Sequence, residues 1–270
     1  MNLAPPGEWV ARRSTAVITA VFAIAVVAEP LRVAYESTLV AAFRDHDEVY
    51  ASMMNGPMVL VLPLVAVLLT CLPLFQRLRA RHVANMRARV SARRLVVLQL
   101  GRVAIIAGGA FFLHAFVAFM VAHVVWPWLG DPAIDPAGVN LPPAEARLDV
   151  LGRSSYSFLV AHGHFTFGVL YAAWIGAAAA AYATLGACML FLLPNRILAL
   201  SIPFLVYATG TTASAFLESP QTGLMNSLFP FGLAAGHPLE AAASTLIVIL
   251  GTAALAVLVI VRAPTNPRLS

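Results

Sequence analysis

Apolar residues run along this chain in six long stretches, and the short segments between them hold most of the charged residues. Each stretch approaches or exceeds the roughly 20 mainly apolar residues that a helix needs to cross a bilayer. The pattern therefore predicts an all-α, polytopic membrane protein with six transmembrane helices. The predicted spans cover residues 15–35, 58–75, 98–126, 165–193, 197–216 and 241–261.

The composition agrees with this pattern. Hydrophobic residues make up 60% of the 270 positions and charged residues only 11%, and the mean hydropathy is +0.84. An ordinary water-soluble globular protein carries about twice that share of charge. We therefore expect a single transmembrane domain over residues 1–270.

The distribution of charge predicts the orientation. All 17 basic residues are arginine. If both termini are cytoplasmic, thirteen of these 17 fall in inner segments and eleven of the 12 acidic residues in outer segments. This is the bias that the positive-inside rule describes. The absence of lysine and the abundance of alanine suggest a bacterial source, and hence a bacterial plasma membrane with both termini inside.

The segment between the second and third spans is densely basic. Residues 77–94 contain seven arginines and no acid. Val83, Met86 and Val90 recur at helical spacing, which favours a short interfacial helix within residues 76–97. Two interpretations stay open: the arginines hold the loop inside and contact anionic lipid headgroups, or they dock a cytoplasmic partner.

Two stretches resemble a known family. Residues 54–106, "MNGPMVLVLPLVAVLLTCLPLFQRLRARHVANMRARVSARRLVVLQLGRVAII", are similar to the permease subunit of an ATP-binding-cassette (ABC) exporter of the type-2 superfamily, in which a proline-containing second span leads into an arginine-rich cytoplasmic connector. Residues 164–210 resemble that family's small-residue fourth span, very short inner turn with Asn-Arg, and fifth span with a central Pro-Phe. The order of these features carries the likeness.

The resemblance implies a function and its partners. The chain would be a permease subunit that exports a substrate with energy from a separate cytoplasmic ABC ATPase, which would hold the ATP and magnesium, and it would pair with a second permease half. The connector would contact the ATPase through the residues matching the family pattern, namely Arg87, Arg89, Ser91, Arg93 and Arg94. An amino-terminal interfacial helix over residues 1–14 would join that surface through Trp9, Arg12 and Arg13. The alternative for residues 1–14 is an ordinary, positively flanked start to the first span.

Other classes of function find little support. A P-loop ATPase needs the lysine of G-x-x-x-x-G-K-[ST], and this chain has none. The G-x-S-x-G and H-E-x-x-H motifs of hydrolases and zinc proteases are also missing. Arginine on the inner face suffices to explain the basic pI, so nucleic-acid binding is not needed. We expect no enzymatic activity and no cofactor in this chain, and we expect Cys71 and Cys188 to be packing residues.

The outer side holds the remaining candidates. Glu29, beside Pro30, is either an intramembrane acid on the substrate path or the first residue outside the first span. The long loop over residues 127–164 should be irregular, with one short helix at residues 142–152.

The histidines give the main competing hypothesis. His114 and His123 are nine residues apart and so face opposite sides of a helix. His123, His162 and His164 all lie at the outer end and could converge to bind haem or a metal. The alternative function is therefore a histidine-ligated haem or metal-binding membrane anchor for electron transfer. For each histidine the simpler interpretation is a hydrogen-bonded interfacial side chain.

Overall fold

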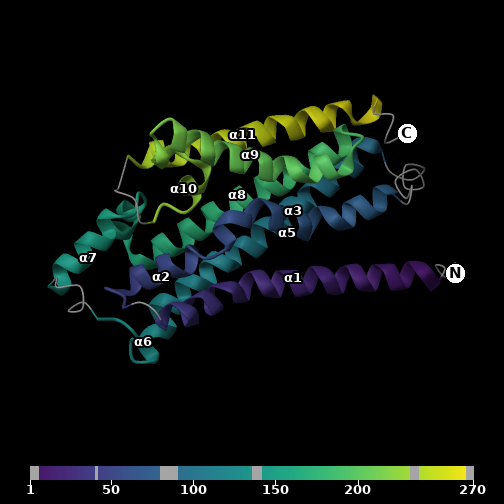
Figure 1. Ribbon diagram of the computed structural model, residues 1–270. Coiled ribbons are helices and arrows are strands. Elements are labelled where there is room, and N and C mark those ends of the chain that lie inside the picture. Colours follow the sequence, from purple (N-terminus) through teal and green to yellow (C-terminus); the bar gives the residue numbers. More distant parts are fainter. Residues whose placement is uncertain (1–5, 40–41, 80–90, 136–141, 232–236, 266–270) are drawn as a thin grey trace.

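The computed structural model describes residues 6–39, 42–79, 91–135, 142–231 and 237–265, and over these ranges the protein is helical (Figure 1). Two isolated bridges, Phe43 with Ile134 and Ser154 with Phe231, are the β-type pairings in this part of the chain. The prediction of an all-α fold is confirmed.

Each predicted span falls on one long helix, except that the third span, residues 98–126, also includes the turn that follows its helix. These helices are α1 (Pro6–Thr38), α3 (Met58–Arg79), α5 (Ala92–Met120), α8 (His164–Leu192), α9 (Arg196–Phe216) and α11 (Pro238–Arg262). Helix α5 continues through a π-helical turn η1 (Val121–Val125) into α6 (Trp126–Trp128). The shorter elements are α2 (His46–Met54), α7 (Pro143–Gly152), α10 (Leu224–Leu228) and the 3₁₀ turns η3 (Ser157–His162), η4 (Pro220–Thr222) and η5 (Ala263–Thr265).

Among the described residues, four helical stretches are long and apolar enough to cross a membrane: Ala92–Trp128, His164–Leu192, Arg196–Phe216 and Pro238–Thr265. A fifth is possible if α2 and α3, which meet at 53°, form one bent span. These long apolar helices are compatible with a multi-pass membrane protein. The crossing of all six segments stays a prediction.

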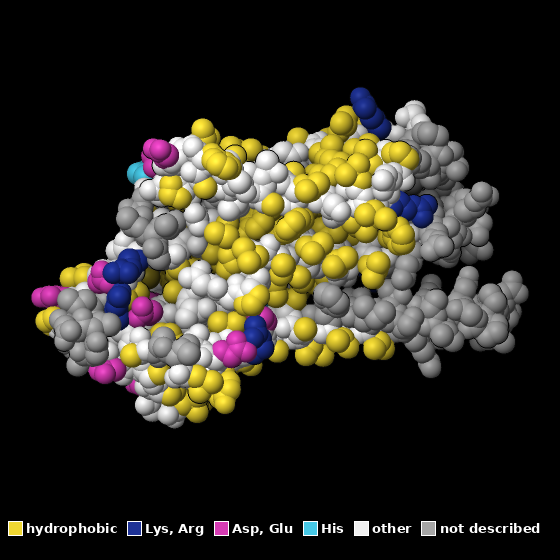
Figure 2. Space-filling model, in the orientation of Figure 1, with side chains coloured by type: hydrophobic (Ala, Val, Ile, Leu, Met, Phe, Trp, Pro, Cys, Tyr) yellow, Lys and Arg dark blue, Asp and Glu magenta, His cyan; other side chains and the backbone are white. Residues whose placement is uncertain are grey.

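Helix α8 is the centre of the bundle and packs against α3, α5, α9 and α11. Within its most apolar stretch 67% of the residues are buried, against 17% for α11. This difference in burial follows from the sequence. Helix α8 is rich in alanine and glycine, which let neighbouring helices approach closely. Helix α11 instead exposes large apolar side chains, among them Leu246, Ile247 and Leu250. Figure 2 shows a broad apolar band along the side of the bundle.

Helices α5 and α8 approach each other closely, backbone against backbone, at Gly108 and Gly176. A Cβ atom on Gly176 would stand only 2.7 Å from the carbonyl oxygen of Gly108. A Cβ atom on Gly186 would stand 3.0 Å from Val67 on α3. These glycines therefore serve packing within this chain rather than a seam with another one.

The interfacial location predicted for residues 1–14 stays a prediction, but no helix end separates their described part from the first span. Helix α1 runs from Pro6 to Thr38 without a break at residue 14. The reason is local: between Glu8 and Glu29 the sequence has neither glycine nor proline to end the helix. At about 1.5 Å per residue, α1 is about 50 Å long, which exceeds the hydrocarbon thickness of a bilayer.

The connector is described only at its edges. Helix α3 ends at Arg79, and α5 begins at Ala92 after the cap residue Ser91. Residues 80–90, with Arg87 and Arg89, lie outside the described part of the chain, so the connector helix stays a prediction.

The two ends of the bundle differ. Both chain termini lie at one end, and α2, α6 and α7 lie at the other (Figure 1). Described acidic side chains gather toward the end that holds α2 and α7 (Figure 2). There the predicted helix at residues 142–152 is confirmed as α7, Pro143–Gly152.

Candidate functional site

The end of the bundle where α5 and α9 begin has two helix starts fixed by side chains. Ser91 accepts a hydrogen bond from the backbone N–H of Arg94 at 3.4 Å, which caps α5. Asn195 accepts bonds from the N–H groups of Ile197 and Leu198 at 3.1 Å each, which caps α9. The guanidinium of Arg196 then lies 5.5 Å from the ring centre of Phe75 on α3, a cation–π distance.

Three of the eight predicted partner-coupling residues are therefore placed. Ser91 acts as a cap, and Arg93 and Arg94 are exposed in the first turn of α5. Trp9, Arg12 and Arg13 lie on α1, but their side chains lie outside the described part of the structure. The exposed pair Arg93 and Arg94 is available to lipid or to a protein.

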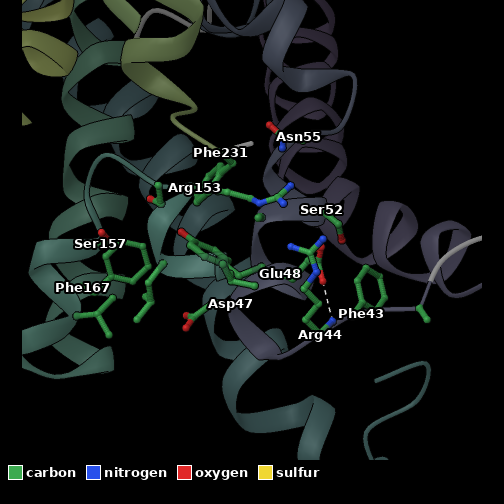
Figure 3. A pocket seen from close by; sticks show the side chains of 17 residues that line it. Phe43, Arg44, Asp47, Glu48, Ser52, Asn55, Arg153, Ser157, Phe167 and Phe231 are labelled. Atoms are coloured by element: carbon green, nitrogen blue, oxygen red, sulfur yellow. Dashed lines mark hydrogen bonds between the residues drawn. The ribbon is translucent and has the colours of Figure 1, made fainter. Parts of the chain in front are cut away.

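The end of the bundle that holds α2 and α7 contains a cavity of about 320 Å³. Its walls come from α2 and its flanks, from the end of α7, from η3 and α8, and from Phe231 (Figure 3). The lining combines aromatic side chains with charged ones: Ala42, Phe43, Arg44, Asp47, Glu48, Tyr50, Ala51, Ser52, Asn55, Val150, Leu151, Arg153, Ser154, Ser157, Val160, Phe167 and Phe231. Glu29 is not among these residues, and its place on a substrate path stays a prediction.

Ion pairs hold the walls of this cavity together. Asp149 on α7 pairs with Arg44, and its carboxylate also lies 3.1 Å from Nε of Arg153. The backbone N–H of Arg44 donates to Glu48 at 2.6 Å, the bond drawn in Figure 3. These contacts fix α7 against the segment that leads into α2.

A capping side chain marks the start of helix α2. Asp45 accepts a hydrogen bond from the N–H of Glu48 at 2.9 Å and so caps the helix. Burial raises the pKa of the Asp45 carboxyl to about 6, with smaller contributions from the nearby Asp47 and Glu48 carboxylates. The cap is therefore partly protonated at mildly acidic pH.

Tyr50 anchors α2 to the bundle. Its fully buried ring packs edge-on against Phe119 of α5, against Phe167 and Tyr171 of α8, and against Phe231, with ring centres 5.9–6.0 Å apart. Such edge-to-face pairs are favourable beyond the area that they bury. This cluster fixes the position of the neighbouring residue Asp47.

A cluster of three potential metal ligands lies beside Tyr50. Asp47 of α2, His123 of η1 and His164 of α8 each offer one ligand atom, and these atoms lie within 4.8 Å of one another. Asp47 Oδ1 is 3.0 Å from His123 Nε2 and 3.6 Å from His164 Nδ1. The side chains of Asp47 and His123 are each 12% exposed, and that of His164 is 38% exposed.

The other two histidines singled out from the sequence, His114 and His162, lie outside this cluster. His114 is fully buried, and its Nδ1 lies 2.6 Å from the carbonyl oxygen of Val26 on α1, so it faces away from His123 as expected. His162 is exposed at the end of η3 and is not part of the cluster. The structure thus brings His123 and His164 together as predicted. The third potential ligand is Asp47 rather than His162, and the sequence did not point to Asp47.

Comparisons of this chain with protein-family models, with curated proteins and with solved structures give no match.

Proposed function

We propose that this chain is the permease subunit of an ABC-type exporter, which moves a substrate across the bacterial plasma membrane with energy from a separate ATPase and pairs with a second permease half. The observation that carries the proposal is the agreement between helix order and the family resemblance. The basic segment joins α3 to α5, and a three-residue turn with the Asn195 cap joins α8 to α9, which contains Pro203.

The positions of the two chain termini support six membrane crossings. A chain whose two termini lie at the same end of a bundle crosses it an even number of times, and Figure 1 places both termini at one end. Counting α1 and α3 with the four apolar stretches gives six. The acids gathered at the opposite end agree with an outer location under the positive-inside rule.

The packing supports a route for force. A push on the connector would act first on the start of α5, at Arg93 and Arg94. Because Gly108 and Gly176 let α5 and α8 pack backbone against backbone, these two helices would tilt together. Their outer ends meet α2 through Tyr50, so the tilt would reshape the outer cavity. Energy entering at the inner end would thus reach the outer end through the helix pair.

Co-purification tests the proposal directly. Tagged chain extracted from its native host should bring down an ABC ATPase. Changing Arg93→Glu and Arg94→Glu together should lower the recovered ATPase and uncouple its hydrolysis from transport, since both side chains are exposed at the start of α5.

The matched control is Arg262→Glu, which reverses an exposed charge in the last turn of α11. Protease protection of a carboxy-terminal tag must show unchanged orientation, because these arginines also help to set it. Absence of any ATPase from the wild-type preparation, or equal loss in the control, would contradict the proposal.

The second candidate is the electron-transfer anchor, which the convergence of His123 and His164 favours. The visible absorption spectrum of the purified protein tests it, because haem gives a Soret band. In the cluster a single carboxylate oxygen lies within 3.6 Å of both rings, which suits a compact ion better than a porphyrin.

A further inference from the structure

We propose that Asp47, His123 and His164 bind one divalent transition-metal ion of the zinc type at the outer end of the bundle. This inference does not depend on the exporter proposal. It also departs from the expectation that the chain carries no cofactor.

The ligand set fits such an ion. Two imidazoles and one carboxylate form a three-ligand N₂O set, as in catalytic zinc sites that keep the fourth position open. Ligand atoms about 2.0–2.2 Å from a tetrahedral ion are about 3.3–3.6 Å from one another. The distances from Asp47 Oδ1 to the two histidine nitrogens, 3.0 and 3.6 Å, bracket that separation. The two histidine nitrogens lie within 4.8 Å of each other, so side-chain rotations that bring them to the same separation would complete the geometry.

The hydrogen bonding of His123 points to a cation. Its Nδ1 lies 3.3 Å from the carbonyl oxygen of Phe119 and its Nε2 lies 3.0 Å from Asp47 Oδ1, so both ring nitrogens face an acceptor. A neutral imidazole carries a hydrogen on only one of its two nitrogens, so in either tautomer the other nitrogen would present its lone pair to an acceptor. Two acceptors at this distance repel each other unless a proton or a metal ion lies between them. A metal-bound histidine usually donates its other N–H in this way.

The surroundings hold the three side chains in place. The ring of Phe119 stacks on His123 with ring centres 4.5 Å apart, and Tyr50 packs edge-on against His123 at 6.1 Å. Asp47 and His123 are mostly buried, whereas the partial exposure of His164 leaves that side of the cluster open to solvent. An ion could enter there, and its fourth ligand would be water or a group of a substrate.

The alternative is a charged pair without metal, in which His123 is doubly protonated against Asp47. A measurement of metal binding distinguishes the metal site from the metal-free pair. Chelator-treated protein in detergent is dialysed against zinc, and bound zinc is measured by elemental analysis. Cobalt is added in parallel, because tetrahedral cobalt gives visible absorption bands. We expect one zinc per chain and a rise in thermal stability on zinc addition.

The variants are Asp47→Asn, His123→Ala and His164→Ala, with His162→Ala as the matched control. Each of the first three should weaken zinc binding by at least about 100-fold, since second-shell changes alone cost 10–100-fold, and the control should bind as the wild type does. His164→Ala is the most informative variant, because this residue is the least buried of the three and its loss disturbs folding least.

Wild-type protein that binds no zinc, or binds it equally after His164→Ala, would overturn the proposal in favour of the metal-free pair. Equal loss in His162→Ala would also overturn it, because the ligands would then differ from those assigned. Co-purification of an ATPase is unaffected by any of these outcomes, so the two proposals fail separately.

Discussion

The crossing of α5 and α8 at Gly108 and Gly176 can be tested by adding a single methyl group. In Gly176→Ala the new Cβ would stand 2.7 Å from the carbonyl oxygen of Gly108 and 3.2 Å from Cβ of Phe112. The first contact is with backbone, which cannot rotate away as a side chain can. The two helices would have to separate, and in doing so they would lose contacts along their whole interface.

The size of the effect follows from two opposing terms. Overpacking of a tight core costs about 1–3 kcal/mol, and the backbone contact puts this site in the upper half of that range. Replacing glycine by alanine inside a helix returns about 1 kcal/mol. The net destabilisation is therefore about 1–2 kcal/mol. At about 2–4 °C per kcal/mol for a chain of this size, the melting temperature should fall by about 2–8 °C.

The matched control is Gly109→Ala, one residue along α5 from Gly108. An added Cβ there meets nothing within 4 Å, so only the helix-propensity gain remains and stability should hold or rise. Thermal unfolding of both variants in the same detergent, followed by loss of the monodisperse peak on size-exclusion chromatography, measures the difference. If Gly176→Ala is as stable as the wild type, or Gly109→Ala loses as much, the close crossing is not a determinant of stability.

Three further predictions concern single side chains. Asn195→Ala removes the cap of α9 and should cost about 1 kcal/mol, whereas Asn195→Asp should keep most of the stability in the same thermal assay. Asp45 has a folded-state pKa raised from 3.8 to about 6, so its contribution to stability is present below about pH 4 and is lost as the pH rises through 6; Asp45→Asn should flatten that part of the profile of melting temperature against pH. Tyr207→Phe removes the 2.6 Å hydrogen bond to the Val59 carbonyl and should cost about 1 kcal/mol. Tyr182→Phe should be neutral, because its buried hydroxyl has no hydrogen-bond partner among the described residues; equal losses in the two variants would refute this.

The long helices could be predicted because the length of an apolar run and its flanking breakers are local properties. The span predicted at residues 165–193 is α8, His164–Leu192, and the one at residues 197–216 is α9, Arg196–Phe216. Between them Pro194 and Asn195 end one helix and cap the next. The helix at residues 142–152 was equally accessible, since Pro142 and Pro143 stand at its start and an acid lies in its first turn.

Helix α2, the π-helical turn and the role of Asp47 were not predicted, because their local signals are weak or absent from the sequence. Helix α2 has a cap signal, Asp45 followed three residues later by Glu48, and this pattern could have revealed it. The helix has few apolar residues, among them Val49, Tyr50 and Met53, and these are buried by helices that are distant in the sequence. No local pattern marks the π-helical turn at Val121–Val125. Asp47 was missed as a ligand because its proximity to His123 is a contact across 76 residues.

The backbone around the cluster argues against an accidental meeting of three polar side chains. Each of the three residues lies beside an irregular feature. Asp47 is on a short helix that bends by 53° into α3, His123 is inside a π-helical turn, and His164 follows Gly163, whose φ of +104° favours glycine. Such features cost free energy and concentrate at functional sites. A bound metal ion joining α2, η1 and α8 would stabilise all three features at once.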